Sequence, residues 1–293
     1  MQENKTLIIK TIQFTEINTL TFDSSLVILV ESGGSKTDWR IKDNKQIIAF
    51  ETINFHPKTI GEEQKNIIET LQKVIPPKSS LIFFGSGCLQ HENQKIIENL
   101  FKPFELEKIE VKSDLLAAGK CIYGTKKGFV GILGTGSVLF KYQNENIDTL
   151  FGGFGFLIGD EGSGFYFGKL MLHKYLNQDI SLGLKELFEE KYGERSIILA
   201  KIYGLEGKQF IGQIQLMSEN KDIQKEINLI HEENIELFLS NYLPKNEKIT
   251  QIGFVGSYAF YNQEILKKIL LKRDIELKQI VQKPINELMK YYF

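Results

Sequence analysis

Short apolar runs alternate with helical patterns in the first half of the chain. The runs LVILV (26–30), QIIAF (46–50), LIFF (81–84) and FVGIL (129–133) have the length and composition of strands, and most are bounded by Gly, Asn, Lys or Ser. Between them, residues 62–75 place apolar side chains three and four positions apart, as one face of a helix requires. This alternation predicts an α/β fold.

The pattern changes in the second half. From Gly164 to about Leu243 it is mostly helical, with brief interruptions near Asn177 and Tyr192, and residues 221–243 have the spacing of a long amphipathic helix. A strand at 252–255, a helix at 262–272, a strand at 275–281 and a helix after Pro284 complete the chain. The length of 293 residues favours two domains, and we place a boundary near residues 112–118. The first 24 residues read as an extension without an assigned role.

Charge and composition narrow the function. The 36 basic and 37 acidic side chains nearly cancel, so there is no bulk electrostatic case for binding nucleic acid or a membrane. Neither Cys88 and Cys121 nor the four histidines have metal-ligand spacing, and we expect buried thiols. The N-terminus lacks a signal-peptide pattern, which predicts a cytoplasmic protein.

Two glycine-containing turns lie between predicted strands. In ESGGSKTDW (31–39), a Gly-Gly turn is flanked by Glu31, Ser35, Lys36 and Thr37, groups that suit a polyphosphate and a hydrated Mg²⁺. GTGS (134–137) repeats this arrangement about a hundred residues later. An ordinary tight hairpin would give either pattern alone, whereas the pair suggests two phosphate-gripping halves.

Asp114 lies in VKSDLLAAGKC, between a predicted strand at 109–111 and a helix. A carboxylate here can cap the helix by accepting backbone N–H groups. It can equally accept a proton from a substrate hydroxyl as a general base. The residues alone leave both roles open.

Two further glycine-rich stretches could bind a ligand through their backbone. GGFGFLIGDEGSGFYFG (152–168) surrounds the acidic pair Asp160 and Glu161. GFVGSYAF (253–260) runs from a strand through Gly256 and Ser257 into a helix, which would let a flat nucleoside approach the backbone. A flexible loop and a plain turn are the alternatives.

Taken in order, these five motifs resemble the N-acetylglucosamine kinase and BadF/BadG-type ATPase family, within the actin, sugar kinase and Hsp70 superfamily. The resemblance runs from about Leu26 to the end. It implies two ribonuclease-H-like domains, 25–115 and 116–275, that face a central nucleotide and sugar cleft. It also implies a helical insertion at about 165–245 and a segment, 276–293, that returns to the first domain.

The resemblance implies an ATP-dependent sugar kinase with Mg²⁺ as cofactor, a small-molecule sugar as substrate and a homodimeric state. Asp114 matches the catalytic base, and Glu31 would sit near the metal. The positions that match ATP contacts are Ser35, Lys36, Thr37, Thr135, Gly136, Gly256 and Ser257. The positions that match sugar contacts are Asn54, Asp114, Ser137, Gly153, Phe154, Gly155 and Asp160.

The chain departs from the family's pattern in its sugar motifs. Val138 follows GTGS where members commonly have Asn, and Phe154 stands where they commonly have Trp. The expected reaction is phosphorylation of the 6-hydroxyl of N-acetylglucosamine or a related amino sugar. The alternative is an ATPase that activates a partner enzyme, as BadF-type proteins do. A sugar sensor without catalysis is less favoured, because Glu31, Asp114 and Asp160 are all present.

Overall fold

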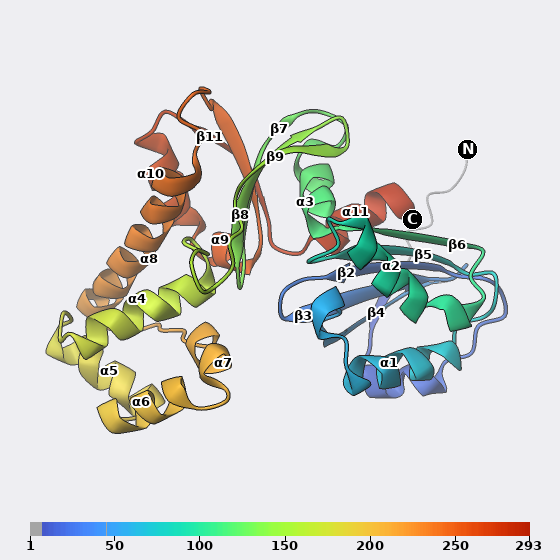
Figure 1. Ribbon diagram of the computed structural model, residues 1–293, viewed down its shortest axis with the longest axis horizontal. Helices are drawn as coiled ribbons and strands as arrows, with labels where there is room; N and C mark the ends of the chain where they lie inside the picture. Colours follow the sequence, from blue (N-terminus) through green and yellow to red (C-terminus); the bar gives the residue numbers. More distant parts are fainter. Residues whose placement is uncertain (1–7, 45) are drawn as a thin grey trace. The chain divides into compact units, whose positions relative to one another are not determined.

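The computed structural model describes residues 8–44 and 46–293. Their contacts divide the chain into two units. Unit 1 comprises Met1–Gly124 and Lys283–Phe293, and unit 2 comprises Thr125–Gln282. Each unit combines one β-sheet with helices, so the predicted α/β class is confirmed (Figure 1).

The sheet of unit 1 has the strand order β1-β4-β3-β2-β5-β6. An antiparallel meander is formed by β2 (Val27–Ser32), β3 (Lys36–Lys42) and β4 (Gln46–Ile53), and β5 (Ser80–Gly85) and β6 (Lys108–Ser113) continue parallel to β2. The helices are α1 (Glu62–Gln72), α2 (His91–Leu100), α3 (Asp114–Tyr123) and α11 (Pro284–Tyr292), with short 3-10 turns η1 (Phe14–Thr19), η2 (Pro57–Thr59) and η3 (Lys102–Phe104). α11 packs on α3, β2 and β3.

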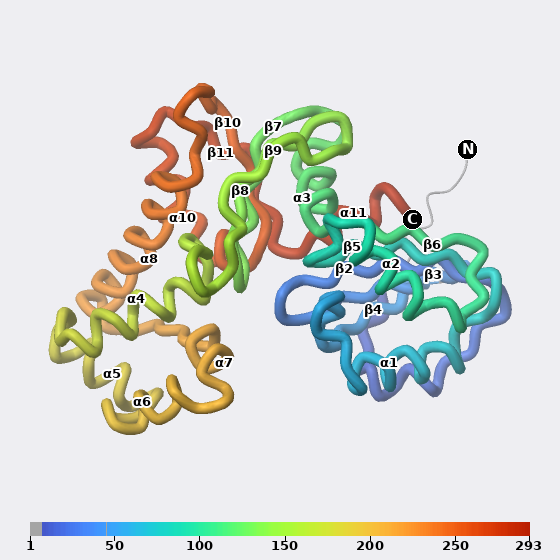
Figure 2. The backbone as a smooth tube through the Cα atoms, in the orientation of Figure 1, coloured from blue at the N-terminus to red at the C-terminus, as the bar shows by residue number. Residues whose placement is uncertain are grey.

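The sheet of unit 2 has the order β11-β10-β7-β8-β9, which repeats the order and directions of β6-β5-β2-β3-β4. Its strands are β7 (Gly128–Leu133), β8 (Ser137–Gln143), β9 (Asn146–Gly152), β10 (Gln251–Val255) and β11 (Glu276–Val281). Five helices lie between β9 and β10: α4 (Gly164–Leu176), α5 (Leu182–Tyr192), α6 (Arg195–Tyr203), α7 (Gly207–Gly212) and α8 (Lys221–Tyr242). After β10 come α9 (Ser257–Tyr261) and α10 (Gln263–Leu271), and the path through the unit is seen in Figure 2.

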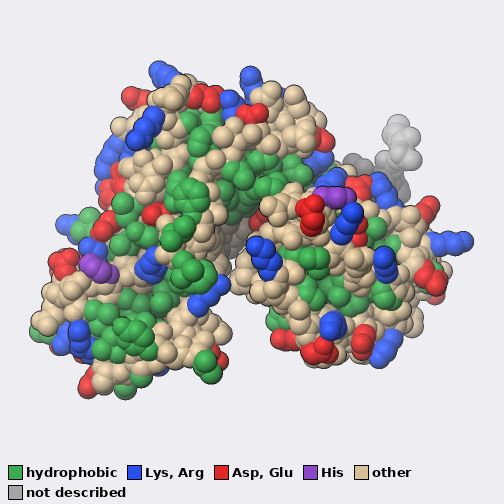
Figure 3. Space-filling model, viewed as in Figure 1, with side chains coloured by type: hydrophobic (Ala, Val, Ile, Leu, Met, Phe, Trp, Pro, Cys, Tyr) green, Lys and Arg blue, Asp and Glu red, His purple; other side chains and the backbone are tan. Residues whose placement is uncertain are grey.

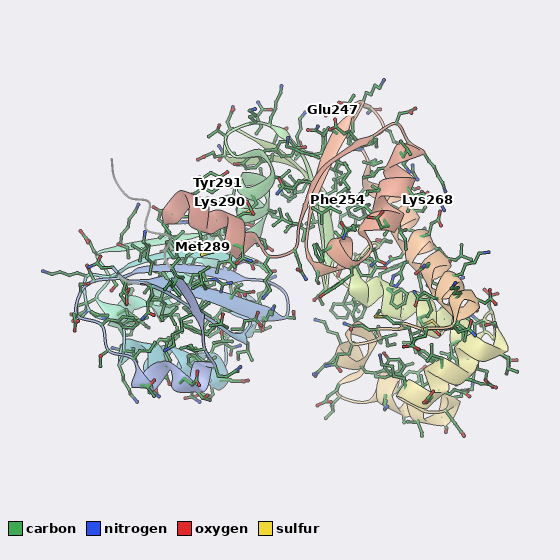
Figure 4. All side chains as sticks on the ribbon, turned by 180° about the vertical axis from the view of Figure 1, so that it is seen from behind. Glu247, Phe254, Lys268, Met289, Lys290 and Tyr291 are labelled. Carbon is green, nitrogen blue, oxygen red and sulfur yellow. The ribbon has the colours of Figure 1, made fainter. Side chains whose placement is uncertain are left out.

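Each unit has its own apolar core. In unit 1, Trp39 is fully buried and stacks on Phe50 with ring centroids 5.6 Å apart. In unit 2, Phe254 of β10, labelled in Figure 4, is fully buried beside Gly131 of the neighbouring strand β7. A Cβ at Gly131 would lie 2.5 Å from the Phe254 ring, so the glycine is required for this packing.

The predicted N-terminal extension, residues 1–24, is integrated into unit 1 where it is described; residues 1–7 lie outside the described part. β1 (Ile8–Thr11) pairs in parallel with β4 and becomes an edge strand. Ile12 and Ile17 join the core, and Ile17 is fully buried. The extension therefore completes the sheet, which its position ahead of the first core strand did not indicate.

The two units meet the predicted domain limits only approximately. The expected boundaries were 115/116 and 275/276, whereas the contacts divide the chain after Gly124 and after Gln282. The difference has a clear cause at each place: α3 packs on α11 and on the strands of unit 1, and β11 hydrogen-bonds to β10 of unit 2.

On the face shown in Figure 3, Lys and Arg side chains are interspersed with Asp and Glu, in keeping with the net charge of -1. Among the described residues, no helix has both the length and the apolar character needed to cross a lipid bilayer. Cys88 and Cys121 are both buried free thiols, as predicted.

Candidate functional site

The residues that the sequence singled out lie at corresponding edges of the two sheets. In unit 1 most of them follow the carboxyl ends of β2, β4 and β6, and in unit 2 those of β7, β9 and β10. In open α/β sheets, ligands bind at the carboxyl ends of the strands, where loops diverge and backbone groups are left unpaired. The topology thus gives each unit a candidate ligand-binding edge of its own.

The first glycine turn joins β2 to β3. Gly33 N–H donates to the carbonyl of Lys36 at 2.9 Å and closes the turn, which leaves Ser35 exposed at its tip. The hydroxyl of Thr37 is buried and donates to Oγ of Ser32 at 2.8 Å. Ser35 is therefore placed to meet a ligand, whereas Thr37 holds the hairpin together.

Lys36 belongs to a charged network beside this turn. Its ammonium lies 2.7 Å from Oε1 of Glu51, which also accepts from Lys283 at 2.5 Å. Burial alone would raise the pKa of Glu51, but the hydrogen bonds from Lys283 and Lys36 lower it to about 2. Lys283 also approaches buried Asp38 at 3.4 Å. The segment that precedes α11 thus helps to fix the position of Lys36.

Glu31, at the end of β2, faces other carboxylates. It lies directly opposite Asp38 in the antiparallel β2–β3 pair, so both side chains are on one face of the sheet. Burial, and then repulsion from Asp114 and Asp38, raise the pKa of Glu31 to about 8. This environment favours the protonated form of Glu31. A bound cation would relieve the repulsion and favour the ionised form.

Asp114 is the first residue of α3, and the N-cap position is taken by the preceding residue, Ser113. Ser113 is the N-cap residue and accepts the N–H of Leu115 at 3.2 Å. Oδ1 of Asp114 accepts from the Ser113 hydroxyl and from the same N–H, at 3.1 and 3.0 Å. Burial raises the pKa of Asp114 to about 6, although these hydrogen bonds lower it. At neutral pH it is an ionised carboxylate close to its titration point.

Asn54 follows β4 and reaches the first glycine turn. Its Nδ2 donates to the carbonyl of Gly34 at 3.0 Å. The backbone carbonyl of Asn54 accepts from Nε2 of Gln64 in α1 at 2.9 Å. The predicted sugar-contacting residue therefore lies beside Ser35 and supports the turn.

The second glycine turn, between β7 and β8, is tied to the acidic loop that follows β9. Thr135 is exposed at the tip, while Ser137 is buried. The N–H of Ser137 donates to Oδ1 of Asp160 at 3.3 Å, and its hydroxyl donates to the carbonyl of Glu161 at 2.5 Å. Ser137, Asp160 and Gly136 thus form one compact group, in which Ser137 holds the loop.

Asp160 has a backbone φ of 68°, an uncommon conformation for a non-glycine residue. Its carboxyl group lies close to Gly136, where a Cβ would come within 3.3 Å of it. Burial raises the pKa of Asp160, although the hydrogen bond from Ser137 opposes this shift. The structure holds this carboxylate in one orientation beside the second turn.

The glycine-rich loop has the backbone freedom that its sequence suggests. Gly152, Gly153 and Gly155 have φ values of 78°, 72° and 79°, a region that favours glycine. Phe154 between them is 62% exposed and stands edge-on to Tyr242, with ring centroids 6.1 Å apart. The loop therefore presents backbone and one aromatic ring outward.

Gly256 approaches the second glycine turn closely. Its φ is 116°, and a Cβ there would lie 2.4 Å from the carbonyl oxygen of Leu133 and 3.2 Å from the nitrogen of Gly134. Ser257 follows at the start of α9 and is exposed. The predicted nucleoside turn and the predicted phosphate turn of unit 2 are thus adjacent, because β10 pairs with β7.

The sequence analysis missed several supporting residues. Lys283 and Arg40 flank Asp38 in unit 1, and Tyr242 donates to Glu161 in unit 2. Asn234 of α8 donates and accepts within the glycine-rich loop. A signal existed for Asn234 alone: it is a polar residue within the apolar stripe of a predicted helix.

The residues present fit Mg²⁺ and ATP. Mg²⁺ prefers carboxylate oxygen and is usually held by one or two carboxylates together with substrate phosphates. Glu31, crowded by two further carboxylates, supplies such a ligand. Each unit has a glycine turn whose exposed hydroxyl, Ser35 in unit 1 and Thr135 in unit 2, suits a phosphate oxygen. Among the described residues no group of three or more His, Cys, Asp or Glu is arranged to hold a metal ion.

Comparison with known proteins agrees with this architecture. No protein-family model matches the chain. It is 29% identical over 175 residues to the N-acetylmuramic acid/N-acetylglucosamine kinase of Clostridium acetobutylicum, which is 56% of this chain and 57% of that kinase. The chain thus spans about half the length of this curated relative.

Solved structures match over more of the chain. A candidate N-acetylglucosamine kinase of Porphyromonas gingivalis superposes on 90% of this chain and 98% of its own, with a TM-score of 0.79 and 23% identity. One from Chromobacterium violaceum covers 92% and 99%, at a TM-score of 0.64 and 15% identity. MreB 5 of Spiroplasma citri superposes on 92% of this chain and 96% of its own, with a TM-score of 0.53 and 11% identity. The chain is thus similar in sequence to an N-acetylglucosamine kinase over about half of its length and has the actin-like ATPase fold, as the resemblance predicts.

Proposed function

We propose that this protein transfers the γ-phosphoryl group of ATP to a hydroxyl of N-acetylglucosamine or a related amino sugar, at the 6-position. The observation that carries the proposal is Asp114, a partly buried carboxylate at the end of β6 with a pKa raised to about 6 by burial. A general base works best when its pKa lies near the operating pH. The curated relative, an amino-sugar kinase, supports the substrate class.

In the proposed reaction Asp114 accepts the proton of the sugar hydroxyl as that oxygen attacks the γ-phosphorus. The bond from this phosphorus to the β–γ bridging oxygen breaks, and ADP leaves with the electron pair. The products are ADP and the sugar phosphate. Phosphoryl transfer requires mainly positioning and charge neutralisation, which the hairpins and lysines of this chain can supply.

The nucleotide-binding groups follow from the two turns and from the close approach at Gly256. The hydroxyls of Ser35 and Thr135, the backbone of Gly136 and the ammonium of Lys36 would bind phosphate oxygens. Thr37 would act by holding its hairpin, since its hydroxyl is donated to Ser32. Gly256 and Ser257 would line the adenosine, because a side chain at Gly256 would collide with Leu133.

The sugar-binding groups come from the glycine-rich loop and from Asn54. The backbone of Gly153 and Gly155 and the ring of Phe154 would contact the sugar, and the carboxylate of Asp160 would accept hydrogen bonds from its hydroxyls. Ser137 would contribute by fixing the Asp160 carboxylate. Asn54 already supports Gly34 and would present its remaining amide oxygen to the sugar.

Glu31 would hold Mg²⁺, directly or through water. When bound, the ion would neutralise phosphate charge. The chain's own contribution here is a carboxylate at the end of β2 whose environment disfavours the charged form until a cation is present. That arrangement fits a site that binds metal together with nucleotide.

The alternative, an ATPase that activates a partner through a cysteine-ligated iron–sulfur cluster, finds little support in the thiols. Cys88 is fully buried, and Cys121 nearly so. Burial raises the pKa of both thiols to about 12. Cluster ligation requires accessible thiolates, and neither residue supplies one.

A panel of amino sugars incubated with Mg-ATP tests the proposal, with ADP formation and sugar phosphate measured together. We expect phosphorylation of N-acetylglucosamine or a close relative, and its loss in Asp114→Ala with nucleotide binding retained. ATP hydrolysis without any sugar phosphate across the panel would reject the kinase assignment. Parallel loss of nucleotide binding and transfer in Asp114→Ala would show that Asp114 is only structural.

A further inference from the structure

Asn234 is a fully buried polar side chain in the apolar stripe of α8. Ile227, Ile230 and Phe238 share this stripe and are also buried. An amide in such a position destabilises a core unless its donors and acceptor are all engaged. Its retention there therefore requires specific partners.

Those partners lie in two of the motifs described above. Oδ1 of Asn234 accepts the N–H of Gly162 at 2.7 Å, and Nδ2 donates to the carbonyl of Ser163 at 2.9 Å. Nδ2 also donates to the hydroxyl of Tyr258 at 2.9 Å. The N–H of Gly162 can only donate and the carbonyl of Ser163 can only accept. The orientation of the Asn234 amide is therefore fixed by its surroundings.

The hydroxyl of Tyr258 also contacts a second residue of α8, His231. This hydroxyl accepts from Asn234 and lies 2.8 Å from Nδ1 of His231, one turn earlier in the same helix. His231 stacks on Phe167, with ring centroids 4.0 Å apart, and burial lowers its pKa to about 4. The imidazole is therefore neutral, and Nδ1 can accept a hydrogen bond from the Tyr258 hydroxyl.

The network joins the two ends of the proposed site in unit 2. Gly162 and Ser163 directly follow the acidic pair Asp160 and Glu161, to which Ser137 is tied. Tyr258 comes two residues after Gly256, and Gly256 lies next to Gly134. Asn234 thus connects the loop proposed to bind sugar with the turn proposed to bind adenosine.

We infer that Asn234 is a positioning residue for the proposed kinase reaction, which sets the acidic loop and the Gly256–Ser257 turn in register with each other. The inference rests on the proposed function. Asn234 touches neither substrate. It acts through the backbone of Gly162 and Ser163 on one side and through Tyr258 on the other.

Gly162 shows that the register has little freedom. Its φ is 82°, and a Cβ there would lie 2.7 Å from Phe238, so the loop rests directly on α8. A shift of about 1 Å in a positioned group can cost a factor of ~100 in rate. Removing the Asn234 amide would leave the loop packed on α8 but without its hydrogen bonds at Gly162 and Ser163.

The test compares Asn234→Ala, Asn234→Asp and Tyr258→Phe with Asn228→Ala, which changes an exposed asparagine on the same helix. Steady-state kinetics would be measured with sugar and ATP varied separately, well below the melting temperature of each variant. Amide hydrogen exchange would be followed in segments 156–165 and 253–261. Amide hydrogen exchange requires no enzymatic activity, so it reports on the hydrogen bonds of Asn234 independently of the reaction.

We expect Asn234→Ala to raise KM for both substrates and lower kcat, each by roughly tenfold, and to increase exchange in both segments. Asn234→Asp keeps an acceptor for Gly162 but loses the donors to Ser163 and Tyr258, so it should restore protection at Gly162 only. Tyr258→Phe should affect the ATP side more than the sugar side. Asn228→Ala should match the wild type.

Two results would overturn the inference while leaving the proposed function intact. One is an active wild type with an Asn234→Ala variant that is less stable but kinetically unchanged. The other is increased exchange in 156–165 alone, with KM for ATP unaltered. A wild type that neither phosphorylates an amino sugar nor binds the non-hydrolysable analogue Mg-AMPPNP would instead reject the proposed function.

Discussion

The hydroxyl of Ser113 donates to Oδ1 of Asp114 at 3.1 Å while it caps helix α3 through the N–H of Leu115. Oδ1 of Asp114 also accepts this N–H, at 3.0 Å, so both side chains contribute to the cap. We propose a division of roles in which Ser113, the N-cap residue, contributes mainly to the stability of the helix and the Asp114 carboxylate acts as the base. Substitutions at the two positions should have different consequences.

Asp114→Asn should remove most phosphoryl transfer and leave the fold intact. General-base catalysis contributes typically 10²–10⁴-fold, so we expect a loss of about that size in kcat, with unchanged nucleotide affinity. Ser113→Ala should instead lower the free energy of unfolding by about 1 kcal/mol through loss of the cap. Initial rates and chemical denaturation of both variants check this pair. A larger rate loss in Ser113→Ala than in Asp114→Asn would contradict the division of roles.

The pH dependence of the reaction should show the titration of Asp114. Since the base must be ionised and burial raises its pKa to about 6, kcat/KM should rise with pH and level off above that value. Ser113→Ala removes a hydrogen bond that lowers this pKa, so the rising limb should move to higher pH. A limb near pH 4, unmoved in Ser113→Ala, would show that a different, solvated carboxylate acts.

Gly256→Ala should be far more damaging than Gly134→Ala, although the two glycines are adjacent in space. At position 256 the backbone has a φ of 116°, which residues with a Cβ rarely adopt, and a Cβ there would lie 2.4 Å from the Leu133 carbonyl oxygen. A Cβ at Gly134 would meet no atom within 4 Å. We expect Gly256→Ala to lose roughly 3 kcal/mol or more of stability and Gly134→Ala less than about 1 kcal/mol. Thermal melting of both variants provides the comparison, and equal melting temperatures would be inconsistent with it.

Phe154→Ala should weaken sugar binding without weakening the fold. The ring is 62% exposed, so its removal costs little packing, but it is presented beside the backbone of Gly153 and Gly155. We expect KM for the sugar to rise by about tenfold, since stacking on an aromatic ring is worth on the order of 1 kcal/mol, while KM for ATP stays constant. Leu157→Ala, at a still more exposed apolar position of the same loop (77%), is the control. Equal effects of both substitutions would mean that loop apolarity, not the ring, matters.

The sequence predicted the fold because its local patterns agree with the final packing. The buried strand β7, the long helix α8 and the start of α11 at Pro284 all lie where apolar spacing or proline placed them. β9 was missed, because its residues alternate poorly and remain largely exposed at the sheet edge. β1 was missed since its four residues acquire a structure only by pairing with β4.

The candidate site was predictable where glycine and acid recur in motifs, and not where support comes from distant residues. The sequence indicated Ser35, Asp114 and Asp160 directly. It could not show that the hydroxyls of Thr37 and Ser137 are donated internally, because those bonds depend on strand pairing and on the path of the glycine-rich loop. Lys283 joins Glu51 only through the return of the chain to unit 1.

His231 gives a prediction for stability rather than for rate. Its pKa in the folded protein is lowered by burial to about 4, from an ordinary value of 6.5. As pH falls below 6.5 the unfolded chain takes up a proton that the folded protein does not, so stability is lost progressively down to about pH 4. His231→Gln keeps an acceptor for Tyr258 but does not titrate. The unfolding free energy of the wild type relative to this variant should therefore fall between pH 6.5 and 4, with a slope approaching about 1.4 kcal/mol per pH unit. Urea denaturation across this range measures the difference, and a constant difference would show that the pKa of His231 is the same in the folded and the unfolded protein, so that burial does not lower it.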